Sequence, residues 1–509
     1  MRAVLVGEVM REGTVMGTAA SAFAAVDLGA SSGRVVLGML HGERLDIEEL
    51  HRFENRPLLT EGELQWDVDA LFRETLTGLA RAVAAAAQQG AQLGGIGVDS
   101  WGVDFALLDD AGGIDGPVLH HRGAGDAGAA IRRRGLSAQQ VYERTGVLDQ
   151  AINTSLRLSD LVAAGVAHDQ RVLFVPDLWV HLLTGVTGTD ATIASTSQLL
   201  DPAVAAWADD LLAAGGIGSL RFPTLQSPGT LVGSTTPAVT AALGALRPIP
   251  VFRVAGHDTA SAFAFASPAG TGAEADALIS SGTWSVVGAC VAEPIRDPVS
   301  RECGFTSEIG VHGTLAVQNL NGMWVLQECL REWAATDGAP PDLEELLAEA
   351  SAVRSNGRTF DVASGALLGT GGMVGRVTAL ALRAERDLRG TRGEIVRAIL
   401  DSLAAAYART LRDLARFAGI RFARVRLVGG GSRNRLLCQL TADATGLPVL
   451  AGPAEASSIG NLIVQAAASR GTDDLRAFYR HLSGRGADIQ RFEPAAAEPL
   501  VPRLSERTR

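Results

Sequence analysis

The sequence predicts an α/β protein made of two similar halves, and two short stretches carry that prediction. Residues 25–38 read Ala-Val-Asp-Leu-Gly-Ala-Ser-Ser-Gly-Arg-Val-Val-Leu-Gly, an apolar run, a turn of small residues and a second apolar run. Residues 278–288 read Leu-Ile-Ser-Ser-Gly-Thr-Trp-Ser-Val-Val-Gly and repeat the pattern. Both stretches are typical of β-hairpins. Aligned on Ser-Ser-Gly, they lie 249 residues apart (Ser32 to Ser281), which indicates a duplicated fold with a phosphate site between its halves.

Composition excludes several classes of protein. A chain of 509 residues, 47% hydrophobic and 20% charged, is typical of a globular protein with two or more domains. The net charge of −11 argues against nucleic acid as a partner, and no apolar run reaches the roughly 18–20 residues of a membrane helix. The four cysteines show no CxxC spacing, so neither a zinc site nor a disulfide framework is predicted, and a cytoplasmic location is expected.

The ends of the chain and the crossing between its halves can also be predicted. Charged residues interrupt the only apolar run of residues 1–20, so we expect a disordered extension, with Met10 or Met16 as alternative starts. The expected layout is a first domain at 21–265, a second at 266–485 that begins with a crossing at 266–276, and a tail at 486–509.

The first hairpin carries chemistry that suits a phosphate. A turn of Gly, Ala and Ser lets backbone N–H groups approach an anion, and Arg34 and two hydroxyls add donors. Asp27 ends the preceding strand and could hold a hydrated divalent cation beside that anion. The alternative is an ordinary hairpin with a solvated Asp, which this stretch alone would favour.

Downstream of the hairpin, the pattern predicts two more strands at residues 35–40 and 45–53, then a helix from Asp67 or Asp69 to Gln89. Residues 95–108 then read as a strand, a polar break and another strand. The break gathers Asp99, Trp101, Gly102 and Asp104 at one sheet edge. A Trp beside a Gly and carboxylates can present an apolar face and acceptors to a sugar, although a buried structural Trp is the simpler interpretation of Trp101 alone.

A further strand, near residues 250–255, ends at Gly256-His257-Asp258 and is followed by a small-residue helix. Many α/β folds place chemistry on a carboxylate at the carboxyl end of a strand. The competing interpretation is that Asp258 only caps the helix.

The second half repeats this logic. Residues 317–327 predict a strand end that feeds a helix, and residues 394–419 a long amphipathic helix. Residues 423–434 predict a strand that runs into the turn Gly429-Gly430-Gly431, where backbone can lie against a nucleotide. Residues 455–461 open a small-residue helix that could approach the same turn.

Taken together, these motifs resemble the FGGY carbohydrate kinases, and within them the rhamnulokinase group. The resemblance spans about residues 24–480, and its motifs are Val26–Arg34, Gly97–Phe105, Gly256–Ala262, Ile279–Ser285, Asn319–Gln327, Leu427–Asn434 and Ala451–Gly460. It implies two duplicated actin-like (ribonuclease-H-like) domains with ATP, Mg²⁺ and a ketose, L-rhamnulose first, in the central cleft. It also implies a monomer or homodimer whose partners are these small molecules.

The resemblance assigns roles residue by residue. It implies that Asp258 is the general base on the sugar's primary hydroxyl and that Asp27 lies near Mg²⁺. The residues expected to bind the ketose are Trp101, Gly102, Asp104, His257, Thr259 and Asn319. The residues expected to bind ATP are Ala30, Ser31, Ser32, Gly33, Arg34, Thr283, Gln327, Gly430 and Gly431.

Two departures and two rival interpretations remain. Ser100 stands where the group usually has Thr, and residues 120–126 lack the expected Tyr-Arg-Asp run, which leaves the substrate contacts there open. One rival is a kinase of the same family that acts on L-fuculose or xylulose. The other is an actin- or chaperone-like nucleotide switch, which has no need for Asp258, His257 and Trp101 in its cleft.

Overall fold

The computed structural model describes residues 21–42, 44–123, 126–265, 274–354, 359–384, 390–472, 478 and 489–495. The predicted extension at 1–20, most of the crossing at 266–276 and most of the tail at 486–509 lie outside these residues. The proposed domain limits therefore stay a prediction.

The first half is built on a six-stranded sheet. Its strands β1 and β2 form the predicted hairpin, β3 extends it antiparallel, and β6 and β14 add to the other side of β1 in parallel. In sheet order the strands are β13 (Leu231–Ser234), β14 (Pro250–Phe252), β6 (Leu93–Ser100), β1 (Ser21–Leu28), β2 (Ser32–His41) and β3 (Arg44–Glu54).

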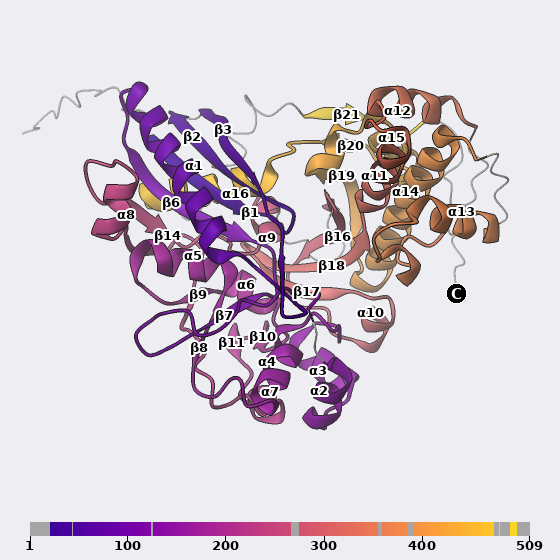
Figure 1. The fold of residues 1–509 in the computed structure, drawn as a ribbon. Coiled ribbons are helices and arrows are strands. Elements are labelled where there is room, and N and C mark those ends of the chain that lie inside the picture. Colours follow the sequence, from indigo (N-terminus) through magenta and orange to yellow (C-terminus); the bar gives the residue numbers. More distant parts are fainter. Residues whose placement is uncertain are drawn as a thin grey trace, which may run out of the picture.

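The second half is built on a seven-stranded sheet (Figure 1). The hairpin of β15 and β16 is extended antiparallel by β18, and β19 and β20 add to the other side of β15 in parallel. In sheet order the strands are β17 (Thr306–Gly310), β18 (Gly313–Asn321), β16 (Trp284–Val291), β15 (Glu274–Ser281), β19 (Arg421–Val428), β20 (Val449–Ala451) and β21 (Gln490–Phe492).

The two sheets therefore share one topology, which confirms the predicted α/β class and its duplication. The alignment that suggested it was wrong in register, however. Ser31 lies in the first turn and Ser32 begins β2, whereas Ser280 and Ser281 end β15 before the second turn. The last paired residues before the turn are Leu28 and Gly33 in the first hairpin and Ser281 and Ser285 in the second, so Leu28 is equivalent to Ser281. Small residues are needed on either side of a tight turn, so a Ser-Ser-Gly triplet can stand in the turn and the strand after it in one hairpin and in the strand and turn before the return strand in the other.

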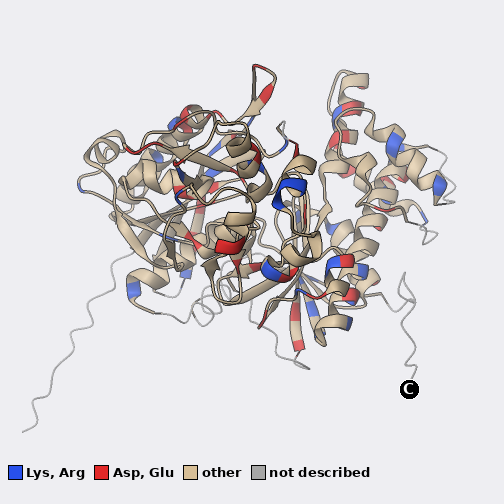
Figure 2. Ribbon diagram, turned by 90° about the horizontal axis from the view of Figure 1, so that it is seen from below, with Lys and Arg blue, Asp and Glu red and all other residues tan. Residues whose placement is uncertain are grey.

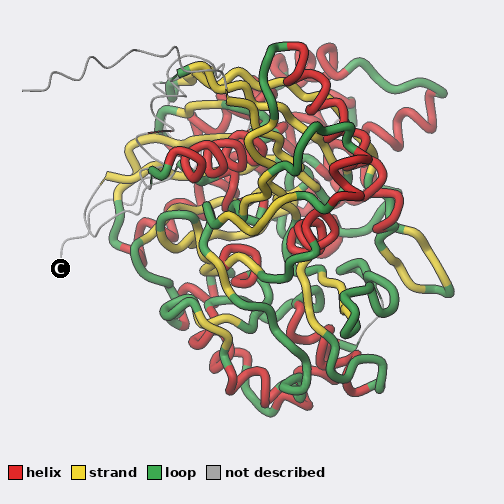
Figure 3. Tube along the Cα trace, turned by 90° about the vertical axis from the view of Figure 1, so that its left-hand side faces the viewer, coloured by secondary structure: helices red, strands yellow, loops and turns green. Residues whose placement is uncertain are grey.

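Alternating side chains along β1 place a helix on each face of the first sheet. Ala22, Ala24 and Val26 pack in the core beneath α1 (Val68–Gln88), whereas Phe23 and Ala25 pack against α16 (Ala456–Arg470), whose sequence comes from the second half. Helix α16 also lies directly on α9. In Figure 1, α16 (yellow) overlaps the strands of the first sheet and α9 lies beside it, and Figure 3 views the molecule from the side of the first sheet.

The two long helices whose limits the sequence predicted, at 67–89 and 394–419, begin and end within two residues of those limits. Asp67 caps α1, and Thr391 and Glu394 form a capping box at the start of α14. The helices that pack on the sheets or on the helices beside them are α1 (Val68–Gln88), α5 (Val175–Thr184), α9 (Asp258–Ala262), α11 (Trp324–Asp337), α12 (Leu343–Ala352), α13 (Met373–Arg383), α14 (Arg392–Ala418), α15 (Arg435–Thr445) and α16 (Ala456–Arg470).

Smaller elements complete each half. In the first half they are β4 (Leu58–Thr60), β5 (Glu63–Gln65), β7 (Phe105–Leu108), α2 (Ala127–Arg134), α3 (Ala138–Thr145), α4 (Thr154–Ala163), β8 (Arg171–Phe174), β9 (Thr189–Asp190), α6 (Ala191–Ser195), β10 (Leu200–Asp201), β11 (Ala206–Trp207), α7 (Asp209–Ala214), β12 (Leu225–Gln226) and α8 (Pro237–Ala242). In the second half they are α10 (Pro298–Glu302), η1 (Gly365–Leu367) and η2 (Gly430–Arg433).

Charged residues of both signs are scattered over both halves (Figure 2). None of the helices in the described ranges combines the length and the apolar character needed to cross a membrane.

Candidate functional site

The site begins where three strands of the first sheet end. Asp27 near the end of β1 lies opposite Asp99 near the end of β6, because these neighbouring strands are parallel and in register. The loop after β14 continues this edge. The Ser100 N–H donates to the Gly256 carbonyl at 2.8 Å, and Ser100 pairs with His257 in an isolated parallel β-bridge. Asp258 follows as the first residue of α9. Three carboxylates from distant segments thus share one edge of the sheet.

The electrostatics of these carboxylates favour a bound cation. Burial, reinforced by the charge of Asp27, raises the pKa of Asp99 well above its ordinary value. Burial also raises the pKa of Asp258, where the charge of His257 lowers it and that of Asp27 raises it. Asp99 is fully buried, and its Oδ1 has no hydrogen-bond partner in the described structure. Uncompensated negative charge of this kind is stabilised by a cation or by protonation.

Asp27 is fixed by the helix that comes from the second half. It is 2% exposed, and its Oδ2 accepts hydrogen bonds from the hydroxyls of Ser457 and Ser458 at the start of α16. One turn further along α16, the Asn461 amide donates to Asp99 Oδ2 at 2.6 Å. Helix α16 therefore orients both carboxylates, and the chain at its start also approaches the triple-Gly turn, as the sequence suggested, since the Gly429 N–H donates to the Pro453 carbonyl at 3.2 Å.

The hairpin turn beside Asp27 is tight and open to solvent. The Gly29 N–H donates to the Ser32 carbonyl at 3.0 Å, and the Asn55 side-chain amide donates to the Gly29 carbonyl at 2.9 Å. Ala30 and Ser31 are exposed. A Cβ on Gly33 would stand 2.3 Å from the Phe53 ring, so only glycine fits there.

Arg34, predicted to hold phosphate, is already paired. Its Nη1 contacts Glu455, the residue before α16, and its Nε lies 3.6 Å from Asp27 Oδ2. Glu455 also accepts from Arg433 at 3.1 Å, at the end of the triple-Gly turn. Arg34 and Arg433 therefore reach the same carboxylate from the two halves.

Trp101 belongs to an aromatic cluster built around Asp104. The indole N–H groups of Trp66 and Trp101 both donate to Asp104 Oδ2 at 2.8 Å, and His121 Nδ1 lies 2.9 Å from the same atom. Arg157 donates to Asp104 Oδ1 at 2.6 Å. Burial alone would raise the pKa of Asp104, but the hydrogen bond from His121 and the charge of Arg157 lower it to about 2.

The predicted direct contact between Asp104 and substrate needs correction for this reason. Asp104 is 1% exposed and both of its oxygens are engaged by protein donors. Its place is behind the wall that Trp66, Trp101 and His121 form, where it fixes their orientation. Trp101 itself is only 7% exposed.

The backbone between Trp101 and Asp104 is strained. Val103 has φ +67°, a left-handed conformation that is rare for a β-branched residue. Its N–H donates to Thr196 and its carbonyl accepts from Thr154, so tertiary contacts hold it there. A Cβ on Gly102 would lie 3.1 Å from Thr196, so this loop lies tightly against α6 and its flanking residues. Strain of this kind is common where a site is preorganised.

At the start of α9, His257 is the N-cap residue and Asp258 is not. Asp258 accepts from the Thr259 hydroxyl at 3.2 Å, lies 3.5 Å from His257 Nε2, and keeps 34% of its side chain exposed. The alternative that Asp258 serves only as a cap is therefore not supported. On the other side of His257, Nδ1 lies 3.0 Å from Glu308 of β17, in the second half.

In the second half, the predicted nucleotide residues lie around the second hairpin. The carbonyl of Thr283 accepts from the N–H groups of Gly322 and Trp324, which joins the hairpin turn to the start of α11. Gln327 on α11 and Asn319 on β18 are exposed. Across from them, Arg122 of the first half lies 5.9 Å from the Trp284 ring and 5.8 Å from the Trp324 ring.

The three glycines of the turn have different roles. Gly429 has φ +80°, and a Cβ on Gly431 would stand 2.2 Å from the Ser281 hydroxyl. Both therefore let the turn pack on the end of β15. Gly430 is exposed and has open space around it, which suits the close approach of a ligand.

Several residues that shape the site carried no local sequence signal. They are Asn55, Trp66, His121, Arg157, Glu308, Glu455, Ser457, Ser458 and Asn461. Each lies far along the chain from its partner, apart from Asn55 and His121. The adjacent pair His120-His121 was the one visible clue, since two neighbouring imidazoles are uncommon on a plain surface.

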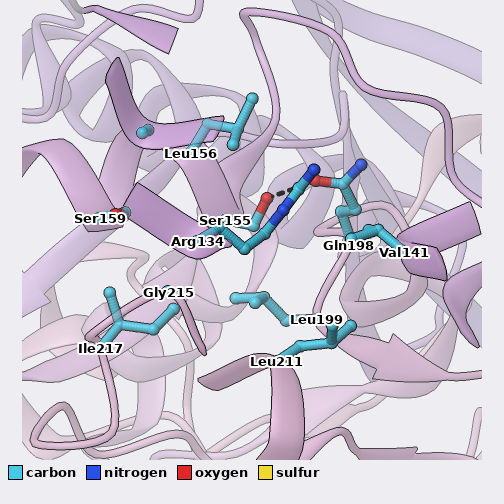
Figure 4. A pocket seen from close by; sticks show the side chains of 11 residues that line it. Arg134, Val141, Ser155, Leu156, Ser159, Gln198, Leu199, Leu211, Gly215 and Ile217 are labelled. Carbon is cyan, nitrogen blue, oxygen red and sulfur yellow. Dashed lines mark hydrogen bonds between the residues drawn. The ribbon is translucent and has the colours of Figure 1, made fainter. Parts of the chain in front are cut away.

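A small enclosed cavity lies elsewhere, between α2, α4 and α7 (Figure 4). Its volume of about 10 Å³ is close to the least that a single water needs. Arg134 Nε and Ser159 Oγ are buried at its wall without a hydrogen-bond partner in the described structure. The cavity suits one water and is too small for a sugar.

Comparison with protein families covers most of the chain. Residues 22–264 match the N-terminal domain, and residues 277–469 the C-terminal domain, of the FGGY family of carbohydrate kinases.

Comparison with individual proteins agrees with this family match. A protein named rhamnulokinase from Bacteroides thetaiotaomicron is 35% identical over 478 residues, which cover 93% of this chain and 96% of that protein. A second rhamnulokinase, from Enterococcus faecalis, is 35% identical over 465 residues, 89% of this chain and 91% of that protein.

Solved structures share the fold at low identity. A gluconate kinase from Lactobacillus acidophilus aligns with TM-score 0.72 at 14% identity, over 94% of both chains. A xylulose kinase from Rhodospirillum rubrum gives 0.72 at 20% identity, over 93% of this chain and 94% of that one. A glycerol kinase from Plasmodium falciparum, solved with ADP, gives 0.71 at 13% identity over the same shares.

Proposed function

Because this chain belongs to the FGGY family of carbohydrate kinases, we propose that it transfers the terminal phosphoryl group of ATP to the C1 hydroxyl of L-rhamnulose. The products would be L-rhamnulose 1-phosphate and ADP, in a step of L-rhamnose catabolism. The observation that carries the choice of sugar is the 35% identity to rhamnulokinases over 93% of the chain.

The aromatic cluster and the start of α9 support the sugar side of this proposal. Trp66 and Trp101, held by Asp104, would form an apolar wall, and the backbone of the loop at Gly102, which lies tightly against Thr196, would make the sugar contact expected there. His257 and Thr259 flank Asp258 and would line the sugar beside it. Asn319 would reach the sugar from the second half.

Asp258 would act as the general base. Its partly exposed carboxylate can accept the proton of the C1 hydroxyl as that oxygen attacks the terminal phosphorus of ATP. The new O–P bond forms while the bond to the bridging oxygen of ADP breaks, and the proton ends on Asp258. Burial raises the pKa of Asp258, so the carboxylate is more basic than an ordinary Asp.

The phosphates would lie at the first hairpin turn. Ala30 and Ser31 form an exposed turn, Ser32 follows at the start of β2, and Gly33 packs tightly against Phe53. Arg34 would leave or share its contact with Glu455 to meet the transferring group. Positioning and charge neutralisation supply most of the catalysis in phosphoryl transfer.

Asp27, with the buried Asp99 beside it, fits a hydrated Mg²⁺ held together with the nucleotide, because Asp99 Oδ1 is buried without a partner in the described structure. When bound, Mg²⁺ would neutralise charge on the phosphates. Thr283, Gln327, Gly430 and Gly431 would hold the rest of ATP from the second half.

A panel of ketoses tests the proposal. Initial rates of ADP release are measured with ATP, Mg²⁺ and L-rhamnulose, L-fuculose or D-xylulose. We expect the highest kcat/KM for L-rhamnulose. A higher value for L-fuculose or D-xylulose would assign the chain to another sugar within the family, and nucleotide hydrolysis unaffected by every sugar would favour the nucleotide switch.

A further inference from the structure

A carboxylate of the second half lies against the proposed catalytic loop of the first. Glu308 is 5% exposed, and its Oε2 lies 3.0 Å from His257 Nδ1. The two groups form an ion pair rather than a well-aligned hydrogen bond. The other imidazole nitrogen, Nε2, lies 3.5 Å from Asp258 Oδ1. The order in space is thus Glu308, His257, Asp258.

We propose that Glu308 is a positioning residue for phosphoryl transfer: it holds the His257 ring so that its Nε2 faces Asp258. This inference rests on the proposed function, in which Asp258 accepts the proton of the sugar hydroxyl. Glu308 itself touches neither the sugar nor the phosphate in this arrangement.

Hydrogen bonds to neighbouring elements hold the backbone at both members of the Glu308–His257 ion pair. The N–H of Ile309, next to Glu308, donates to the Ser195 hydroxyl at 2.9 Å, and the Ser307 N–H donates to the Gly146 carbonyl at 2.9 Å. The His257 N–H donates to the Thr192 hydroxyl at 3.2 Å. Strand β17 is therefore docked on the first half, so the separation of the two charges is set by contacts outside the pair.

The charges around His257 are mainly negative. Burial lowers its pKa, but the charges of Glu308, Asp258 and Asp190 outweigh burial and raise the pKa to about 9. Asp27 and Asp99 add negative charge beyond Asp258. At neutral pH His257 is therefore charged, and its charge opposes the upward shift that burial gives to the pKa of Asp258. Without the carboxylate of Glu308, the pKa of His257 falls toward its ordinary value of about 6.5.

The experiment compares Glu308→Gln with Ser195→Ala. Gln keeps the shape of Glu308 and removes its charge, whereas Ser195→Ala removes a hydrogen bond at the next residue of the same strand and no charge. The titration of His257 is followed by NMR of histidine-labelled protein, with His257→Asn used to assign its signal. In parallel, kcat/KM for L-rhamnulose is measured from pH 6 to pH 8.

We expect the titration of His257 to move down toward neutrality in Glu308→Gln and to stay in place in Ser195→Ala. The loss in kcat/KM for Glu308→Gln should grow from a few-fold at pH 6, where His257 is still charged, up to about 10²-fold at pH 8. An unmoved titration, or a loss that is equal at pH 6 and pH 8, would overturn the inference. A parent enzyme that phosphorylates no ketose would instead refute the proposed function, and the NMR titration would still test the ion pair.

Discussion

Replacing Asp258 by Asn removes the proposed base and keeps the shape of the side chain. The amide oxygen of Asn can still accept the hydrogen bond of Thr259, and His257 remains the N-cap of α9. The variant loses the ion pair with His257 at 3.5 Å. It also loses repulsion from Asp27 and Asp99, which offsets part of that change.

The expected effects on stability and on rate differ widely. A carboxylate with a third of its surface exposed contributes under about 1 kcal/mol through such a pair, so the melting temperature should move by only a few degrees. Removing a general base typically costs about 10²–10⁴ in rate. We therefore expect kcat for L-rhamnulose to fall by two to four decades while the fold is unchanged.

The assay couples ADP release to NADH oxidation, and thermal unfolding of the same samples is the control. The parent should also gain activity as Asp258 ionises, at a higher pH than an ordinary Asp would require, because burial raises its pKa. Turnover by Asp258→Asn within a few-fold of the parent would refute the assignment and make Asp99 the next candidate for the base.

Three further predictions concern stability. Asp104→Asn should lower the free energy of unfolding by about 2–3 kcal/mol at pH 7, because the folded protein depresses the pKa of Asp104 from 3.8 to about 2. In urea titrations this deficit should be full above about pH 4 and disappear as the pH falls toward 2; a deficit that persists at pH 2 would contradict it. Gly460→Ala should cost about 3 kcal/mol, because its Cβ would stand 1.9 Å from the Ser261 carbonyl where α16 crosses α9. Gly375→Ala, which has open space in α13, is the matched control and should be neutral or stabilising. A chain that starts at Met16 should keep the parent's kcat and melting temperature, and a clear loss of either would show that residues 1–15 contribute to the fold.

Local patterns accounted for much of the fold. Alternating apolar residues and small-residue turns predicted both hairpins, and capping residues such as Asp67 predicted the helix boundaries. The confirmed duplication followed from the hairpins, even though the Ser-Ser-Gly alignment was out of register. That error arose because small residues satisfy a turn equally well on either side of it, so composition could not fix the register.

The surroundings of the site were harder to predict, because they depend on contacts between distant segments. Nothing near Glu308 indicates that it faces His257, and nothing near Ser457 indicates that it bonds Asp27. The sequence grouped Asp104 with Trp101, but the donors that occupy both of its oxygens, from Trp66, Trp101, His121 and Arg157, could be found only in the folded structure. The roles assigned to individual residues stay predictions until they are measured.

Identification of the reaction product would show both whether the sugar is phosphorylated and at which carbon. The enzyme is mixed with ATP, Mg²⁺ and L-rhamnulose, and the phosphorylated product is examined by ³¹P NMR with coupling to the sugar protons. We expect one new phosphate monoester, coupled to the two C1 protons and formed in equal amount to ADP. Inorganic phosphate as the only new phosphorus signal, or an ester at a different carbon, would contradict it.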